Sequence, residues 1–397
     1  MNCLIIGKVW PEPTSTAAGQ RTYDVITALQ LGCWQVHFAS AAQRGEHALD
    51  LEAIGVTTHE IAVNDAAFDP WVEALAPQVV IFDRFMTEEQ YGWRVAQRCP
   101  EAVRVLDTSD LHCLRLAREQ VIKSGEALKL KNDIALREIA AIYRSDLTLM
   151  ISEFEMKILV DEFSINESLL AYWPFSLELS EECVLYENRK DFILIGSFLH
   201  PPNLDAVRWC KAEIWPLIRQ QLPEAELHCY GSYGDRFAAE LHAPKNGFYF
   251  KGRAEDALAT MTLYRVNLAP LRYGAGLKGK VFDGFQTGTP TVMTPIAAEG
   301  ISTNLGWAHT AAEDFANAAL QLYREPEAWR IRQCEERALC QDRFNSADWL
   351  PRLAAIMQCV IGEKVQLREQ NFIGKILRHH QHRSTEFMSR WIELKNK

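Results

Sequence analysis

The sequence has 397 residues, of which 48% are hydrophobic and 24% charged, and its formal net charge is -10. A chain of this length exceeds one ordinary hydrophobic core, so we expect two globular domains. The acidic balance argues against a broad nucleic-acid surface, because binding to phosphates depends on clustered Lys and Arg. The ten cysteines form no CxxC pair and no Cys/His metal-ligand spacing, which favours reduced thiols in a cytoplasmic protein.

The N-terminal run from Met1 to Gly7 is too short for a secretory signal and has no basic leader. No apolar stretch approaches the roughly 20 residues that a membrane-spanning helix needs. We therefore expect a protein that contacts membranes, if at all, at their surface.

Short apolar runs alternate with longer segments that can hold helices, which is typical of parallel α/β sheets. The first series of predicted strands comprises 3–7, 34–40, 79–82, 103–107 and 147–152. The second series comprises 192–196, 227–231, 248–252, 266–270 and 291–294. The sequence thus predicts two Rossmann-like domains whose strand ends face a central cleft, since ligands of such sheets bind beyond the carboxyl ends of the strands.

The charged stretch from Glu178 to Lys190 lacks the continuity of a core strand, so we set the domain boundary there. The predicted domains are 1–175 and 190–345. A helical, locally basic tail, residues 346–397, follows and is expected to pack back on the domains, with helices over Trp349–Cys359 and Glu363–Leu377. Its basic residues, such as Arg378 and Lys397, suit either a solvated helix, which we favour, or one that docks on anionic lipid.

The segment from Ala269 to Thr294 has the pattern strand, glycine-rich loop, helix, glycine stop, strand. Its glycines let the backbone approach a ligand, and a helix that begins near Lys278 directs free N–H groups and a partial positive charge toward it. Asp283, one turn further, is placed to accept hydrogen bonds from ribose. The alternative is a tight turn with solvated lysines. The predicted diphosphate-binding residues are Arg272, Gly274, Gly276, Lys278, Gly279 and Lys280.

The run from Ala269 to Pro290, followed by Thr294–Ile301, resembles the donor-site signature of family-four retaining glycosyltransferases, which have the GT-B fold. Gly196 and Ser197 resemble the first strand end of that family's donor domain. In the first half, the segment around Gly19 resembles the glycine loop that faces the acceptor. The resemblance covers about residues 1–345 and is strongest in the second domain.

The resemblance implies transfer of a hexosyl or deoxyhexosyl group from a nucleoside-diphosphate sugar, with retained anomeric configuration and no obligatory metal or other cofactor. The acceptor would be a glycan, a lipid-linked sugar or a cell-surface polysaccharide precursor, at the inner face of the cell membrane. Arg272 and Lys278 would stabilise departing negative charge. His112, in a segment that resembles a central cleft loop, would orient a hydroxyl, and Asp110 of the same segment would lie on the acceptor side with Gly19. Glu299, Gly196 and Ser197 would bind the ribose or the sugar of the donor. Both carboxylates and the histidine also suit ordinary caps and structural positions.

The sequence departs from the family where many members have two glutamates eight positions apart, because it has Ala275 and Asp283 there. We interpret this as a variant site. A degenerate protein that binds nucleotide or a partner, and a sugar-nucleotide epimerase, are the alternatives. A nicotinamide-dependent dehydrogenase is disfavoured, because the segment Gly7–Trp10 lacks a GxGxxG fingerprint.

Overall fold

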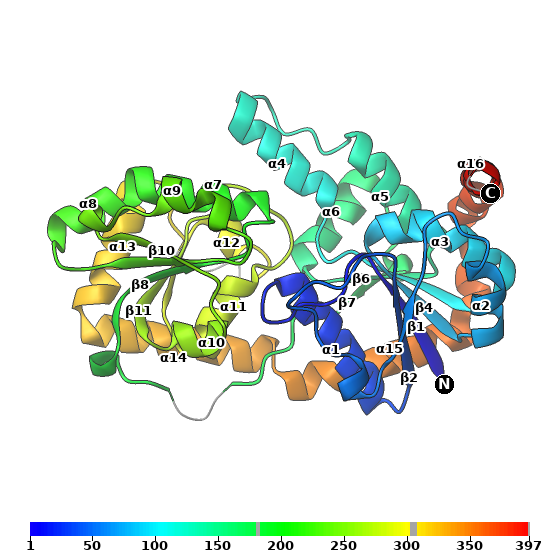
Figure 1. The fold of residues 1–397 in the computed structure, drawn as a ribbon, viewed down its shortest axis with the longest axis horizontal. Helices are drawn as coiled ribbons and strands as arrows, with labels where there is room; N and C mark the ends of the chain where they lie inside the picture. The colour runs from blue at the N-terminus through cyan, green and yellow to red at the C-terminus, as the bar shows by residue number, and fades with distance from the viewer. Residues whose placement is uncertain (180–182, 302–307, 396–397) are drawn as a thin grey trace.

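The computed structural model describes residues 1–179, 183–301 and 308–395. These residues form two α/β units that lie next to each other, with one sheet in each (Figure 1). The α/β class and the presence of two Rossmann-like units are confirmed.

The first sheet has seven parallel strands in the order β3-β2-β1-β4-β5-β6-β7. Its central strands are buried along almost their whole length, which explains their continuous apolar runs. The strand order reverses beside β1, and open α/β sheets bind ligands at such a point. The strands are β1 (Asn2–Gly7), β2 (Gln35–Ser40), β3 (Thr57–Glu60), β4 (Val79–Asp83), β5 (Val103–Asp107), β6 (Leu147–Met150) and β7 (Leu170–Tyr172).

The two edge strands, β3 and β7, were not predicted. β3 reads Thr-Thr-His-Glu and has no buried residue, and β7 has only three residues. An edge strand needs no continuous apolar run, because it is not covered like a central one. The pattern that identifies central strands therefore fails at the edges of this sheet.

The second sheet has five parallel strands in the order β10-β9-β8-β11-β12, all at predicted places. Its strand order also reverses beside the first strand of the unit, so both units repeat one plan. The strands are β8 (Lys190–Ile195), β9 (Leu227–Tyr230), β10 (Phe248–Gly252), β11 (Tyr264–Ala269) and β12 (Thr291–Met293).

Helices cover both sheets. Those of the first unit are α1 (Ala17–Leu31), α2 (Phe68–Leu75), α3 (Arg84–Arg98), α4 (His112–Ser124), α5 (Asp133–Arg144) and α6 (Glu153–Phe163). Those of the second unit are α7 (Pro201–Trp209), α8 (Trp215–Gln221), α9 (Ala238–Leu241), α10 (Ala257–Met261), α11 (Gly279–Gln286), α12 (Pro295–Ala298), α13 (Ala312–Arg324) and α14 (Pro326–Arg343).

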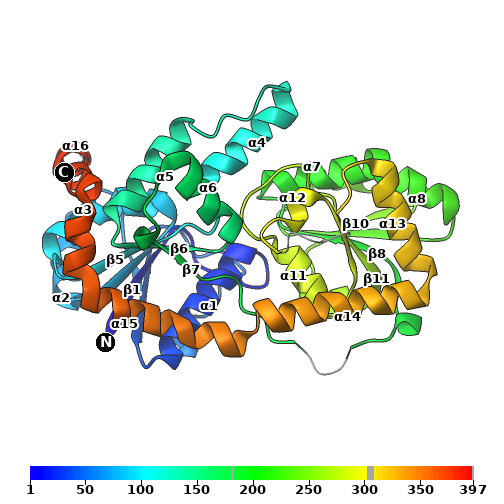
Figure 2. The ribbon, with the colours of Figure 1, turned by 180° about the vertical axis from the view of Figure 1, so that it is seen from behind.

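The chain then crosses back to the first unit through α15 (Ser346–Gln370), as Figure 2 shows. Apolar residues of α15, such as Leu353 and Met357, complete the core on one face of the first sheet. α16 (Phe372–Lys395) packs on α3 and α5, where Glu393 pairs with the buried Arg94. Both helices are longer than predicted, and Lys397 lies outside the described residues.

Within the described ranges, no helix combines the length and the apolar character that crossing a bilayer requires.

Candidate functional site

The loop between β11 and α11, residues 270–278, lies against the carboxyl edge of the first sheet. A Cβ atom added to Gly276 would be 2.9 Å from the Cβ of Asp110 and 3.1 Å from the Ser109 carbonyl oxygen. Gly276 also has a φ of 64°, in the left-handed region that glycine favours. We call residues 270–280 the donor loop; its contact with the first domain depends on the absence of a side chain at Gly276.

Two helix N-termini meet at this interface. A Cβ atom on Gly279, the first residue of α11, would be 2.8 Å from the Cβ of Ala17, the first residue of α1. The first turn of a helix has unpaired N–H groups and a partial positive charge. Their convergence favours an anion at the boundary between the domains.

Lys278 is buried at this boundary. Its ammonium donates to the Gly276 carbonyl at 2.6 Å and lies 3.9 Å from a Glu299 carboxylate oxygen. Burial lowers its pKa, while the Glu299 and Glu155 carboxylates oppose that change. A cation with so few direct partners in a buried place is suited to hold an incoming anion.

Lys280 points to the start of α7 in the second domain. It donates to Asn203 at 2.7 Å, and the Asn203 amide in turn donates to the Ser197 carbonyl at 2.8 Å. A Cβ atom on Gly196 would be 2.8 Å from the Lys280 ammonium, so glycine is needed for this approach. Burial lowers the pKa of Lys280 to about 8. Asn203 thus links Lys280 to the strand end that contains Gly196 and Ser197.

Asp283 follows Lys280 by one helical turn. Burial raises its pKa to about 7, and the Lys280 charge only partly opposes this. Near neutral pH the side chain is therefore balanced between an acceptor-only carboxylate and a carboxylic acid that can also donate.

Arg272 reaches the same helix α7 by another route. Its guanidinium pairs with Asp205, with 2.9 Å between Nε and a carboxylate oxygen, and lies 6.0 Å from the centre of the Trp209 ring. Arg272 was predicted from the sequence to be one of the positive groups that bind the diphosphate. In the structure Arg272 is paired with Asp205 of α7.

Glu299 is bound by the first domain. Arg118 of α4 donates to both of its carboxylate oxygens, at 2.6 and 2.7 Å, and to the Gly274 carbonyl at 2.8 Å. The side chains of Arg118 and Glu299 are 13% and 11% exposed, so this bidentate pair is largely shielded from water. Sequence reasoning named His112 at the start of α4 but did not find Arg118, because nothing in the sequence connects Arg118 with Glu299, 181 positions away.

His112 is the first residue of α4. Its backbone N–H donates to Glu138 at 3.0 Å, and its ring lies 3.3 Å from Asp110 and edge-on to Phe85. Asp110 also pairs with Arg115. Burial opposes ionisation of Asp110, but Arg115 and His112 hold its pKa below the usual range. His112 is thus oriented by a carboxylate beside the donor loop.

Glu155 of α6 is a second residue that the sequence argument missed. It is fully buried and accepts hydrogen bonds from the N–H groups of Gly276 at 2.5 Å and Leu111 at 3.3 Å. Burial and the Asp110 charge raise its pKa to about 8. One carboxyl group therefore joins the donor loop to the loop after β5.

Gly19 has a packing explanation. It lies in the first turn of α1, and a Cβ atom there would be 2.5 Å from the backbone of Glu12. Its N–H donates to Thr16, which caps the helix.

In the described part of the chain, no group of three or more His, Cys, Asp or Glu side chains is arranged to hold a metal ion.

Residues 189–325 match the family model described as Glycosyl transferases group 1. A search of curated proteins finds no match. Among solved structures, Anabaena HepE in complex with UDP and glucose has a TM-score of 0.69 at 12% identity, over 90% of this chain and 100% of that one. A glycosyltransferase from Rickettsia africae has 0.65 at 12%, over 91% and 98%. Sucrose-phosphate synthase from Thermosynechococcus elongatus has 0.64 at 14%, over 94% and 99%.

The chain has a GT-B fold. The family match falls on the second domain of this GT-B fold, which contains the donor loop, and supports a glycosyltransferase. Each of these three structures is covered almost completely, so both domains of the GT-B fold are represented in this chain.

Proposed function

We propose that this chain transfers a sugar from a nucleoside-diphosphate sugar to an acceptor hydroxyl. The observation that carries the proposal is the donor loop, where buried Lys278 and half-buried Lys280 flank the N-terminus of α11 and this N-terminus meets that of α1. These groups supply positive charge where a diphosphate would leave. HepE, which has the same fold, was solved with UDP and with UDP-glucose, which supports the same class of donor here.

In the proposed reaction the acceptor oxygen forms a bond to the anomeric carbon, and the bond from that carbon to the diphosphate oxygen breaks. The electron pair of the broken bond stays on the diphosphate, and the hydroxyl proton passes to its departing oxygen. The transition state resembles an oxocarbenium ion, and the anomeric configuration is retained. Lys278 and Lys280 stabilise the charge that develops on the leaving group, with no metal required.

His112 and Asp110 are proposed to contact the transferred hexosyl or deoxyhexosyl group. Asp110 lies 3.3 Å from the Nε2 atom of His112 and so fixes the orientation of the ring. The other ring nitrogen is the one that we propose faces the transferred sugar. Glu299, held by Arg118, acts mainly by keeping the donor loop closed on the first domain. Asp283 is proposed to contact the ribose.

The nucleotide-binding alternative without transfer rests on Ala275, which replaces a carboxylate of the related signature and packs into the core of the first domain. The epimerase alternative shares the donor and differs in its products. Product analysis separates the two from the proposed transferase, because only a transferase makes a new glycosidic bond.

The proposed acceptor is a glycan or a lipid-linked polysaccharide precursor at the cytoplasmic face of the membrane, and α16 is the proposed membrane contact. Its outward side chains include Phe387 at 66%, Trp391 at 52% and Leu394 at 70% exposure. Exposed Arg390 and Lys395 lie beside them. Apolar residues flanked by basic ones suit a surface of anionic lipid.

Point variants test the membrane contact better than deletion of the tail, because deletion would leave buried Arg94 without Glu393. Trp391→Ser with Leu394→Ser should reduce sedimentation with vesicles that contain phosphatidylglycerol. Val365→Ser, at an equally exposed position on α15, is the control. Equal sedimentation of all variants would remove the membrane contact from the proposal.

The first test of the function is thermal unfolding with a panel of nucleoside diphosphates and their sugar conjugates. A ligand at 100 times its Kd adds about 2.7 kcal/mol of stability. The shift should be selective for one nucleotide and absent in Lys278→Ala. An unchanged melting temperature with every nucleotide would contradict the proposal.

A further inference from the structure

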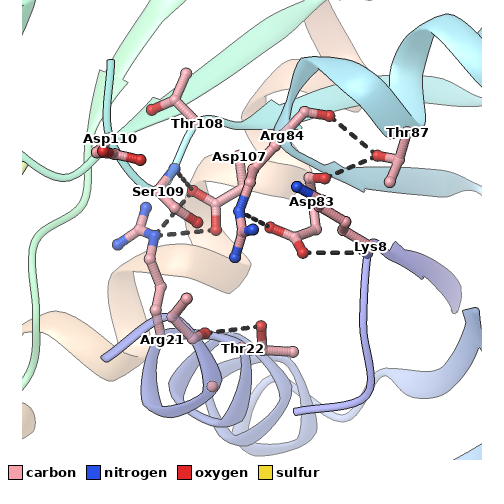
Figure 3. A network of polar contacts seen from close by, with 12 residues as sticks. Lys8, Arg21, Thr22, Asp83, Arg84, Thr87, Asp107, Thr108, Ser109 and Asp110 are labelled. Atoms are coloured by element: carbon pink, nitrogen blue, oxygen red, sulfur yellow. Dashed lines mark hydrogen bonds and ion pairs between the residues drawn. The ribbon is translucent and has the colours of Figure 1, made fainter. Parts of the chain in front are cut away.

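A group of cationic side chains lies at the carboxyl edge of the first sheet, apart from the donor-loop lysines. Lys8 follows β1, Arg84 follows β4, and Arg115 is on α4, which follows β5. Because β1 pairs with β4 and β4 with β5, Lys8 and Arg84 are at adjacent strand ends, and Arg115 is in the first turn of the helix that follows the next strand. Figure 3 shows Lys8 and Arg84 gathered around Asp83 beside the loop that contains Asp110. We call Lys8, Arg84 and Arg115 the basic edge.

The backbone of the basic edge is fixed by hydrogen bonds. Asp83 accepts from the Lys8 N–H at 3.1 Å and lies 3.2 Å from the Arg84 Nε atom. The Thr87 hydroxyl donates to the carbonyls of Asp83 and Arg84, each at 3.0 Å. Arg84 has a φ of 69° although it is not glycine, a conformation that persists where surrounding contacts enforce it and that gathers at functional sites.

The carboxylates nearby do not balance this charge. Asp83 faces Arg84, and Asp110 faces Arg115 and His112. The neighbouring Asp107 pairs with Arg21, whose Nε atom lies 2.8 and 2.9 Å from its two oxygens, and also accepts from the Ser109 N–H.

The Lys8 ammonium has no hydrogen bond or ion pair with any described residue. It is therefore the positive charge of the basic edge that remains to be paired.

The charges of this group act on one another and on the second domain. Desolvation, then Arg84 and Arg115, lower the pKa of Lys8, while Asp83 and Asp110 oppose this change. Burial lowers the pKa of His200 to about 4, with Arg115, Lys280 and Arg84 acting in the same direction and Asp110 opposing them. His200 lies in the loop after β8, so the positive field of the basic edge reaches across the domain boundary.

We propose that the basic edge binds an anionic group of the sugar acceptor, a phosphate or a carboxylate. This inference rests on the proposed function and names the acceptor class for the same site. The donor-loop lysines have their polar partners, Asn203 and Glu299, in the second domain, whereas the basic edge belongs to the first. The Arg84 guanidinium and the unpaired Lys8 ammonium are both hydrogen-bond donors with a positive charge. A phosphate or a carboxylate can accept hydrogen bonds from both of these groups.

The first experiment measures anion binding with the donor site filled. Protein saturated with the nucleoside diphosphate that stabilises it is titrated with inorganic pyrophosphate by calorimetry. We expect binding that weakens at least 10-fold in Lys8→Gln and in Arg84→Gln and weakens with added salt. Arg84→Lys, which keeps the charge, should retain most of it. Lys157→Gln, a 75% exposed lysine on α6, is the matched control.

Absence of pyrophosphate binding, or binding that Lys8→Gln and Arg84→Gln leave unchanged, would overturn the inference. Failure of every nucleoside diphosphate to stabilise the protein would instead count against the proposed function, so the two failures are distinguishable. Transfer assays with four acceptors then identify the source of the anionic group. The acceptors are a hexose 6-phosphate, a hexuronate, a polyprenyl phosphate sugar in phosphatidylcholine vesicles and a neutral hexose. Preference for the neutral hexose would also overturn the inference.

Discussion

The guanidinium of Arg118 in the first domain donates to both carboxylate oxygens of Glu299 in the second, at 2.6 and 2.7 Å. These residues are 181 positions apart in the chain, and their pairing requires the two domains to be in contact. If the two domains opened, the pair would break and both charges would be exposed to water. The pair therefore stabilises the closed arrangement and not the open one.

Arg118→Ala should therefore weaken closure and leave the fold of each domain unchanged. Removing one partner of a buried pair costs about 3–5 kcal/mol of stability. Because this pair exists only when the domains are closed, the cost falls on the closed arrangement. Small-angle scattering should show a larger radius of gyration, and transfer activity should fall. Arg137→Ala breaks an exposed pair with Glu89 inside the first domain and should change neither. Equal radii for both variants would contradict this.

Nucleotide affinity should fall as pH rises above about 8. Burial lowers the pKa of Lys280 to about 8, so its ammonium loses its proton in a range where an ordinary lysine keeps it. A charge-assisted hydrogen bond contributes about 1.5–3 kcal/mol, so we expect about a 10-fold or greater loss of affinity between pH 7 and 9.5. In Lys280→Arg the charge persists and the profile should be flat. Calorimetry at several pH values measures this, and identical profiles would exclude Lys280 as the titrating group.

Asp283→Asn should stabilise the fold above pH 7 and change little near pH 4. Because the pKa of Asp283 is raised to about 7, the native state binds more protons than the unfolded chain between about pH 4 and 7. The contribution of Asp283 to the free energy of unfolding of the wild type therefore falls as pH rises through that window, by at most about 4 kcal/mol. Melting temperatures of both proteins at pH 4.5 and 8 measure the difference. Asp161→Asn, at a half-exposed pair, is the control.

Gly276→Ala should cost more than Gly125→Ala, although both positions have similar φ, 64° and 71°. At Gly125 an added Cβ atom meets nothing within 4 Å, so only backbone strain of about 1 kcal/mol is expected. At Gly276 the Cβ atom would approach Asp110 at 2.9 Å and push the donor loop from the first domain. Loss of transfer activity in the first variant alone would support this reading; equal activities would refute it.

Local patterns were enough to predict much of this molecule. The donor loop from Gly274 to Lys280 could be recognised because its glycines and lysines are adjacent in sequence. The central strands could be recognised because burial on both faces demands continuous apolar runs. Arg118 and Glu155 could not be recognised from the sequence. Each lies on an ordinary helix and forms a hydrogen bond with a residue more than 100 positions away in the chain. The pairing of Arg272 with Asp205 could not be predicted either, since Asp205 is 67 positions away in the chain.

The return of α15 to the first unit has a consequence for synthesis. Leu353 and Met357 fill the core beside Trp34 and Val36, yet they emerge from the ribosome after the whole second domain. The N-terminal half must therefore wait, with one face of its sheet only partly covered, while the second domain folds on its own. The last element made closes the first domain.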